Sequence, residues 1–204
     1  GVVIGGRLGY VVFYNPGYFL AHPLEVFALW QGGMAFHGGL VGVAVGCLWT
    51  ARKHAVAPLE IGDAAAVAAP IGLFFGRLAN FINGELYGRV SDVPWAMVFP
   101  AGGPLPRHPS QLYEAFLEGL VLFVVLAWLA RGAYDPAGRG RLAGVFLLGY
   151  GLARFTVEFV RQYDPQLGLL FGVITMGQLL SLPMIALGAW LVVRTRRRVA
   201  VDGG

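Results

Sequence analysis

One stretch of this sequence gathers arginine, amide and carboxylate side chains directly after an apolar run. In GRLANFINGE, residues 76–85, Arg77 and Asn80 stand three positions apart, so a helix places both on one face. Asn83 and Glu85 follow, where the helix is expected to break at a glycine. Guanidinium groups form paired hydrogen bonds with phosphate or carboxylate. This combination therefore predicts an anion-binding site. For Arg77 taken alone, the alternative is a structural one, in which its side chain extends to the lipid headgroups.

A second polar stretch, YGLARFTVEFVR, spans residues 150–161. Its polar residues Tyr150, Arg154, Glu158 and Arg161 are spaced by four, four and three, which predicts one face of a helix. Arginine within a membrane span costs about 2.5–3.5 kcal/mol on insertion scales, so it needs a partner or a function. We interpret Glu158 as the ion-pair partner of Arg154, with Arg154 and Tyr150 directed into the helix bundle.

The four histidines are the remaining candidates for chemistry. GGMAFHGGL, residues 32–40, places His37 between glycine pairs, where backbones approach closely and a ligand can reach the imidazole. The alternative is a structural hydrogen-bond donor. His22, His37, His54 and His108 lack the spacing of metal ligands, so no metal site is predicted.

The stretch RHPSQLYE, residues 107–114, resembles the start of a helix. Ser110 is predicted to be its N-cap, and capping and packing account for His108 and Glu114. The single cysteine, Cys47, excludes an intramolecular disulfide, and its apolar surroundings predict a structural thiol.

The elements that carry these residues are predicted to be membrane helices. Of 204 residues, 57% are hydrophobic and 13% charged, and the 31 glycines suit close helix packing in lipid. We predict an all-α, polytopic membrane protein forming a single transmembrane domain over residues 1–204. Its six spans are expected at about 1–20, 34–51, 61–80, 111–130, 142–162 and 172–193. Since the sequence starts without methionine and within apolar residues, one more N-terminal helix is expected to be missing.

The distribution of basic residues predicts the orientation. Nine of the 15 lie in three segments on one side of the alternating spans: Arg52, Lys53, Arg131, Arg139, Arg141, Arg194, Arg196, Arg197 and Arg198. The positive-inside rule makes that side, and the C-terminus, cytoplasmic. A lipid-headgroup or nucleic-acid patch is the alternative reading of the basic tail. The Gly- and Pro-rich residues 81–110, with a short strand at PWAMVFP, then form a small extracytoplasmic cap.

Together these features predict a cavity in the outer leaflet, suited to a phospholipid headgroup, which brings together Arg77, Arg154, Asn80, Tyr150 and His37. The pattern alone does not separate catalysis from binding or transport. Transport requires a polar route to the cytoplasmic face, and spans such as VLFVVLAWLA have none. A purely structural scaffold leaves the two arginines without a role.

At these residues the sequence resembles the prolipoprotein diacylglyceryl transferases, a family of bacterial inner-membrane enzymes. GRLANFINGELYGR closely resembles the family signature, and GGRLGYVVFYNP, GGMAFHGGLVG, RHPSQLYEA, GYGLARFTVEFVR and ITMGQLLSLPM resemble further family blocks in the same order. Ala79 stands where members often have glycine, a change that removes no functional group. The family's first helix, with further polar residues, has no counterpart in this sequence.

The resemblance implies transfer of the sn-1,2-diacylglyceryl group from phosphatidylglycerol to the lipobox cysteine of a prolipoprotein signal peptide, releasing glycerol phosphate. It implies no cofactor and no nucleic-acid partner, only these substrates and membrane lipids. The essential residues that the resemblance implies are Arg77 and Arg154. His37 is the candidate base. The other candidate site residues are Asn80, Asn83, Glu85, Gly88, Tyr150 and Glu158.

Overall fold

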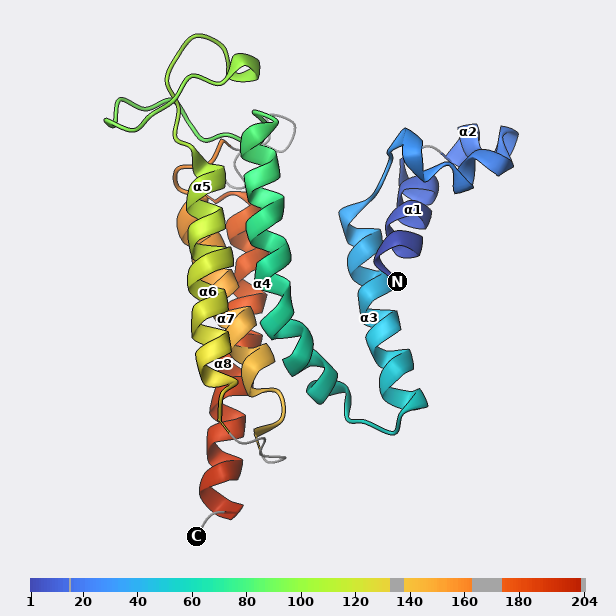
Figure 1. Cartoon of the computed structure of the whole chain (residues 1–204), viewed down its shortest axis with the longest axis vertical. Helices are drawn as coiled ribbons and strands as arrows, with labels where there is room; N and C mark the ends of the chain where they lie inside the picture. Colours follow the sequence, from blue (N-terminus) through green and yellow to red (C-terminus); the bar gives the residue numbers. More distant parts are fainter. Residues whose placement is uncertain (15, 133–137, 163–173, 203–204) are drawn as a thin grey trace. The chain divides into compact units, whose positions relative to one another are not determined.

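The computed structural model describes residues 1–14, 16–132, 138–162 and 174–202, and within these ranges it is helical, with isolated β-bridges but no strand. The chain divides into two compact units, Gly1–Ile61 and Gly62–Gly204. An all-α fold is therefore confirmed for the described residues, and each unit has its own internal packing (Figure 1).

The first unit is built around two helices that pack through glycine. It contains α1 (Val2–Phe13), α2 (Pro16–Ala21), the 3₁₀ turns η1 (Pro23–Phe27) and η2 (Leu29–Gln31), and α3 (Phe36–Lys53). A methyl group on Gly9 would stand 2.8 Å from Cα of Gly38, and one on Gly38 would stand 2.9 Å from Cα of Gly9. Only glycine permits this backbone approach, which is a common way for helices to pack closely in membranes.

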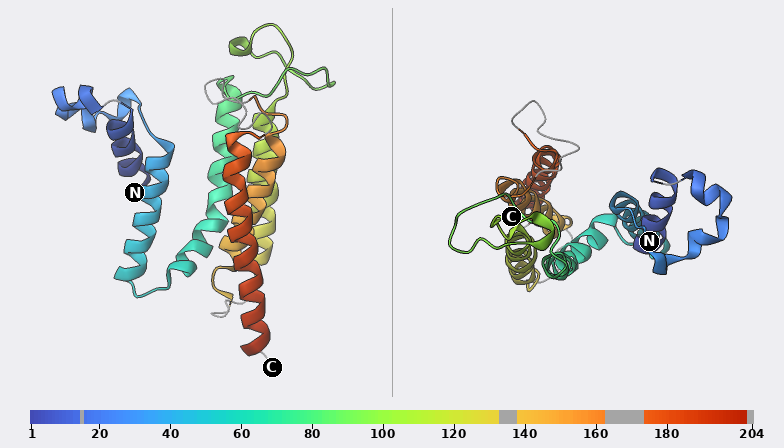
Figure 2. Two further views of the ribbon diagram at one scale, coloured as in Figure 1. Left: turned by 180° about the vertical axis from the view of Figure 1, so that it is seen from behind. Right: turned by 90° about the horizontal axis from the view of Figure 1, so that it is seen from above.

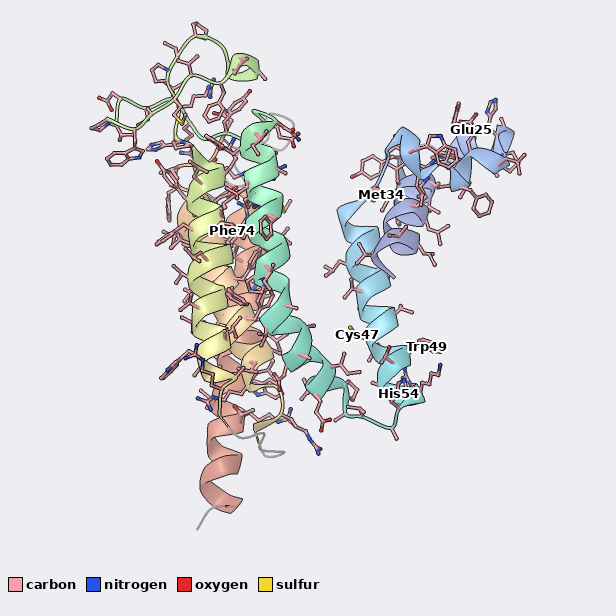
Figure 3. The ribbon with its side chains drawn as sticks, viewed as in Figure 1. Glu25, Met34, Cys47, Trp49, His54 and Phe74 are labelled. Carbon is pink, nitrogen blue, oxygen red and sulfur yellow. The ribbon has the colours of Figure 1, made fainter. Side chains whose placement is uncertain are left out.

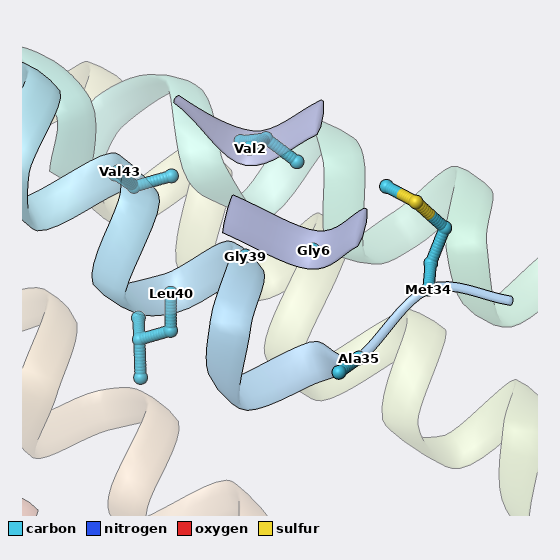
Figure 4. Close-up of a pocket in the computed structure, with 7 residues that line it drawn as sticks. All are labelled: Val2, Gly6, Met34, Ala35, Gly39, Leu40 and Val43. Carbon is cyan, nitrogen blue, oxygen red and sulfur yellow. The ribbon is translucent and has the colours of Figure 1, made fainter. Parts of the chain in front are cut away.

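A buried arginine anchors the loop that leads into α3. Arg7 on α1 donates hydrogen bonds to the carbonyl oxygens of Glu25 (2.6 Å), Val26 (2.9 Å), Gly32 and Gly33 (3.2 Å). Because its charge is satisfied by carbonyl dipoles, Arg7 fixes the turns η1 and η2 against α1. Beside it, an apolar groove of about 430 Å³ runs between α1 and α3 (Figure 4).

The second unit is a bundle of four long helical segments (Figures 1 and 2). They are α4 (Pro58–Ile82), the continuous segment α5 (Ser110–Glu114), η4 (Ala115–Val121) and α6 (Leu122–Leu129), then α7 (Arg141–Val157) and α8 (Met176–Asp202). Here η4 is a π-helical stretch within the second segment. At the α7–α8 contact, methyl groups on Gly144 and Gly151 would each stand 2.8 Å from α8 side chains. Glycine thus sets this packing distance too.

Three of the described helices are long and apolar enough to cross a membrane: Pro58–Ile82, Ser110–Leu129 and Met176–Thr195. The predicted span over 1–20 is interrupted, since α1 ends at Phe13 and α2 begins at Pro16. A proline cannot donate the hydrogen bond that would continue a preceding helix. The 12 residues of α1 extend for about 18 Å, less than the hydrocarbon core of a bilayer.

The segment between α4 and α5 folds over one end of the bundle (Figure 1). Its predicted strand at PWAMVFP is reduced to a single bridge, in which Met97 pairs with Arg107. The Arg107 guanidinium also donates to the Gly102 carbonyl (3.0 Å) and lies over the Tyr87 ring, 5.0 Å from its centroid. Arg107 thus holds the segment together from inside.

Candidate active site

Arg77, near the C-terminal end of α4, contacts two carboxylates of the neighbouring helix. Its Nε lies 3.1 Å from Oε2 of Glu114, and its Nη2 lies 3.4 Å from Oε2 of Glu118. Neither carboxylate side chain is exposed, whereas Arg77 keeps 16% of its side-chain area accessible. Arg77 is therefore held by ion pairs within the bundle and is not simply extended to lipid headgroups.

Arg154 on α7 approaches the same group from another helix. Its Nη1 lies 2.6 Å from Oε1 of Glu114, and its Nη2 lies 2.8 Å from Oε2 of Glu158, four residues further along the chain. The prediction that Glu158 is the ion-pair partner of Arg154 is confirmed. Arg77 and Arg154 are thus joined through one carboxylate.

Arg161 completes the cluster from outside the helix. Its Nη1 lies 3.3 Å from Oε1 of Glu114. The prediction that Arg161 continues the helical face of Tyr150 and Arg154 is wrong, because α7 ends at Val157 and the chain turns there. The Arg161 amide still donates to the Val157 carbonyl (3.0 Å), and this turn returns the side chain to the cluster.

The arginine–carboxylate cluster consists of three guanidinium groups and three carboxyl groups: Arg77, Arg154, Arg161, Glu114, Glu118 and Glu158. Opposite charges placed this close in a low-dielectric region offset much of the cost of burial. Among the described contacts, Nη1 of Arg77 and Nε of Arg154 remain without a partner. The cluster therefore has guanidinium donors left for a further anion.

Small residues bring the contributing helices together. A methyl group on Gly119 would stand 2.8 Å from Cα of Phe74, the α4 residue labelled in Figure 3, so η4 and α4 touch backbone to backbone. The π-helical turns of η4 follow Glu114 directly and include Glu118. Irregular turns of this kind are frequent at functional sites because they redirect side chains.

Asn80, Asn83 and Glu85 form a separate, more exposed group. The carboxylate Oε1 of Glu85 accepts hydrogen bonds from Nδ2 of Asn80 (2.8 Å) and Nδ2 of Asn83 (3.4 Å). The Glu85 carbonyl accepts from Nε2 of Gln111 (2.7 Å), three residues before Glu114. The structure thus brings these three predicted residues together and ties them to α5, while no described contact joins them to the arginines.

Gly88 lies where the segment between α4 and α5 meets the end of α7. Its amide donates to the His108 carbonyl (2.8 Å), and it forms an antiparallel bridge with Arg161. A methyl group there would stand 2.6 Å from both Cβ of His108 and the Val160 carbonyl oxygen. Gly88 therefore permits the approach that keeps Arg161 in place.

Tyr150 lies one turn before Arg154 on α7, stacks on Phe146 with ring centroids 5.8 Å apart, and is within electrostatic reach of Arg77, Arg154 and Glu118. His37 lies in the first turn of α3, in the first unit, and its side chain lies outside the described structure. These electrostatic interactions place Tyr150 near the cluster, whereas the role of His37 stays a prediction.

Sequence reasoning missed two of the three carboxylates of the cluster, those of Glu114 and Glu118. Ser110 is not the N-cap of α5, which is Pro109; its hydroxyl instead donates to the Leu86 carbonyl (3.1 Å). Packing was expected to account for Glu114, and Glu118 was not considered, yet both carboxyl groups are buried against arginine side chains. The available signal was their position in an apolar span, where a carboxylate needs a cation. Within the described residues, no group of three His, Cys, Asp or Glu side chains is arranged to hold a metal ion.

Comparison with known proteins identifies the family of this chain. The sequence profile described as prolipoprotein diacylglyceryl transferase matches residues 1–194. A protein of Methylocella silvestris named phosphatidylglycerol–prolipoprotein diacylglyceryl transferase is 60% identical over 98% of this chain and 74% of its own length. Proteins of the same name from Rhodospirillum rubrum and Vibrio campbellii are 58% and 56% identical, over 100% and 97% of this chain and 76% and 71% of their own lengths. The chain therefore belongs to the prolipoprotein diacylglyceryl transferase family.

Proposed function

We propose that this protein transfers the sn-1,2-diacylglyceryl group of phosphatidylglycerol to the thiol of a prolipoprotein's lipobox cysteine. The observation that carries the proposal is that Arg77 and Arg154 converge on one buried carboxylate in a chain of this family. The names of the relatives supply the two substrate classes, phosphatidylglycerol and a prolipoprotein. Signal peptides with a lipobox cysteine and membrane lipids are the partners, and no nucleic acid is involved.

The reaction balances without a cofactor. The thiolate sulfur of the cysteine attacks the glyceryl carbon that carries the phosphate oxygen, so a C–S bond forms and a C–O bond breaks. The electron pair of the broken bond goes to the phosphate oxygen, and the thiol proton goes to a base. A phosphodiester with one negative charge thereby becomes glycerol phosphate, on which further negative charge develops.

Arg77 and Arg154 meet this developing charge. Both carry planar guanidinium groups that their carboxylates hold in place, and each retains a donor without a partner among the described contacts. Donors fixed before the reaction stabilise charge without reorganising during it. Loss of one such donor typically lowers kcat about 10²–10³-fold.

His37 is our candidate for the base that accepts the thiol proton, since a neutral imidazole does so near neutral pH. The positive field of the arginines, which favours the thiolate, is the alternative to a dedicated base. We assign Tyr150 to the catalytic residues, together with His37, Arg77 and Arg154. We assign phosphatidylglycerol binding to Asn80, Asn83, Glu85, Gly88 and Glu158 together with the two arginines.

We further propose that the protein is a multi-pass protein of the bacterial inner membrane with six spans and a single membrane domain over residues 1–204. The site then faces the outer leaflet, residues 81–110 form an extracytoplasmic cap, and the C-terminus is cytoplasmic. Support comes from the basic segments, because α6 ends and α7 begins at the end of the bundle opposite the segment between α4 and α5 (Figure 1). Arg131 follows α6 by two residues, and Arg141 is the first residue of α7. The orientation is tested in cells with a Cys47→Ala protein that carries one new cysteine, in place of either Gly103 or Gly132. The cysteine at position 103 should react with an impermeant maleimide, and the cysteine at position 132 should not. The reverse pattern would contradict this orientation.

The transferase activity is tested with protein in vesicles containing phosphatidylglycerol, to which a lipobox peptide is added. The mass of the peptide should increase by one diacylglyceryl group. This gain should disappear when the lipobox cysteine is serine and when Arg154 is replaced by alanine. Binding of phosphatidylglycerol without any gain in peptide mass would refute the transferase and leave a lipid-binding protein.

A further inference from the structure

One carboxylate, that of Glu114, contacts all three arginines of the cluster. It reaches Arg77 on α4 (3.1 Å), Arg154 on α7 (2.6 Å) and Arg161 beyond α7 (3.3 Å). The other two carboxylates are less connected, since Glu118 contacts Arg77 and Glu158 contacts Arg154. Glu114 is therefore the single group through which the two proposed phosphate-binding arginines are joined.

Burial separates the carboxylate from any ligand. The Glu114 side chain has no exposed surface, whereas the side chains of Arg77, Arg154 and Arg161 remain 16%, 14% and 18% exposed. The arginines thus lie on the accessible side of the cluster, with Glu114 behind them. A ligand that reaches the arginines from that side does not touch Glu114.

Each of the two proposed phosphate-binding arginines is held through two of its three nitrogens. Arg77 uses Nε and Nη2, and Arg154 uses Nη1 and Nη2. A guanidinium group is planar, so fixing two nitrogens also fixes the direction of the third. The Glu114 carboxylate supplies one of the two contacts in both cases, and it therefore determines how the remaining donors of Arg77 and Arg154 are oriented relative to each other.

From this geometry we propose that Glu114 is a positioning residue, which holds Arg77 and Arg154 at the spacing needed to bind one phosphate group between them and which affects the reaction only through them. The proposal rests on the proposed function. It predicts a loss of turnover when Glu114 changes, because arginines that must be reoriented during the reaction stabilise the departing phosphate less well.

A purely structural role is the competing explanation, because Glu114 also links α4, α5 and α7. Asp63 provides a matched control. Its carboxylate accepts hydrogen bonds from the amides of Gly140 (2.7 Å) and Ala143 (2.8 Å), and so links α4 to α7 at the start of α7, whereas Arg154 lies near its end. Asp63→Asn weakens the same helix pair without touching the arginines.

The test is a double-mutant cycle of transfer to the lipobox peptide, normalised to the amount of folded protein. Glu114→Gln and Asp63→Asn are measured alone and together with Arg154→Lys. We expect Glu114→Gln to lower kcat by roughly 10²-fold, with a smaller change in KM for phosphatidylglycerol. The loss of kcat in the double variant Glu114→Gln/Arg154→Lys should be at least ~10-fold smaller than the product of the losses in the two single variants, since residues acting as one unit are not additive. Asp63→Asn should lower activity by the same factor in both backgrounds.

Multiplicative effects of Glu114→Gln and Arg154→Lys would overturn the assignment, as would wild-type turnover in Glu114→Gln. If Glu114→Gln does not fold, Glu114→Asp, which shortens the side chain by one methylene, is put through the same cycle with the same two outcomes. A wild-type protein that transfers nothing would instead refute the proposed function, and the positioning role with it.

Discussion

Gly177 in the first turn of α8 lies directly against the carboxylate of Glu158. A methyl group on Gly177 would stand 2.7 Å from Cδ and Oε2 and 2.8 Å from Oε1 of Glu158. Only a residue without a side chain leaves that carboxylate where it contacts Arg154 at 2.8 Å. The start of one helix thus sets the position of an ion pair on another.

Gly177→Ala should therefore lower transferase activity. The new methyl group displaces Glu158, and Arg154 loses one of its two carboxylate contacts. We expect at least a ~10-fold loss of kcat, a fraction of the effect of deleting a donor outright. Gly72→Ala on α4 is the matched control, because a methyl group there meets nothing within 4 Å. Its activity should be normal, and equal activities of the two variants would contradict the prediction.

Arg77→Lys should cause a large loss of activity although the charge is kept. Lysine carries its three donors on a single nitrogen and lacks the planar fork, so contacts with Glu114 and Glu118 do not fix the direction of a remaining donor toward a phosphate as they do for Arg77. We expect kcat to fall by about 10²-fold. Near-normal kinetics of the lysine variant, measured by peptide mass, would show that charge alone suffices.

Gly88→Ala should act through backbone packing. The methyl group would collide with His108 and the Val160 carbonyl, each 2.6 Å away, and separate the 83–109 segment from the end of α7. Overpacking of this kind typically costs about 1–3 kcal/mol. We expect a lower unfolding temperature in detergent as well as lower activity. Gly76→Ala, with open space around it, should show neither change.

His37→Gln should abolish turnover and leave phosphatidylglycerol binding intact. Glutamine keeps hydrogen-bonding capacity but does not accept a proton near neutral pH. Transfer is followed by peptide mass, and binding by retention of labelled phosphatidylglycerol on the purified protein. Full activity would remove His37 from the mechanism and favour the arginine field as the source of the thiolate.

The helices could be predicted from the sequence because apolar runs are long and charges few. The face shared by Tyr150, Arg154 and Glu158 followed from spacing alone, and so did the break after α4, where Gly84 adopts φ +67°. These are local properties, and local periodicity encodes them.

The carboxylate partners could not be predicted in the same way. Arg77 meets Glu118 across 41 residues of sequence, and Arg154 meets Glu114 across 40. Spacing along one helix says nothing about such pairs, which depend on how helices dock. The turn after Val157, which returns Arg161 to the cluster, depends on contacts with Gly88 that no local pattern contains.

Arg77 and Arg154 also differ in when their carboxylate partners are synthesised. During synthesis, Arg154 emerges after Glu114 and only four residues before Glu158, so it has a neutralising partner close by in its own segment of the chain. Arg77 precedes both of its carboxylates, the further one by 41 residues. An unpaired arginine costs about 2.5–3.5 kcal/mol at the centre of a span, and α4 is long and apolar enough to be one, so Arg77 has no neutralising partner until Glu114 and Glu118 follow. The order of the chain thus makes the neutralisation of Arg77 depend on the helical segment that follows α4, whereas Arg154 has a partner four residues away.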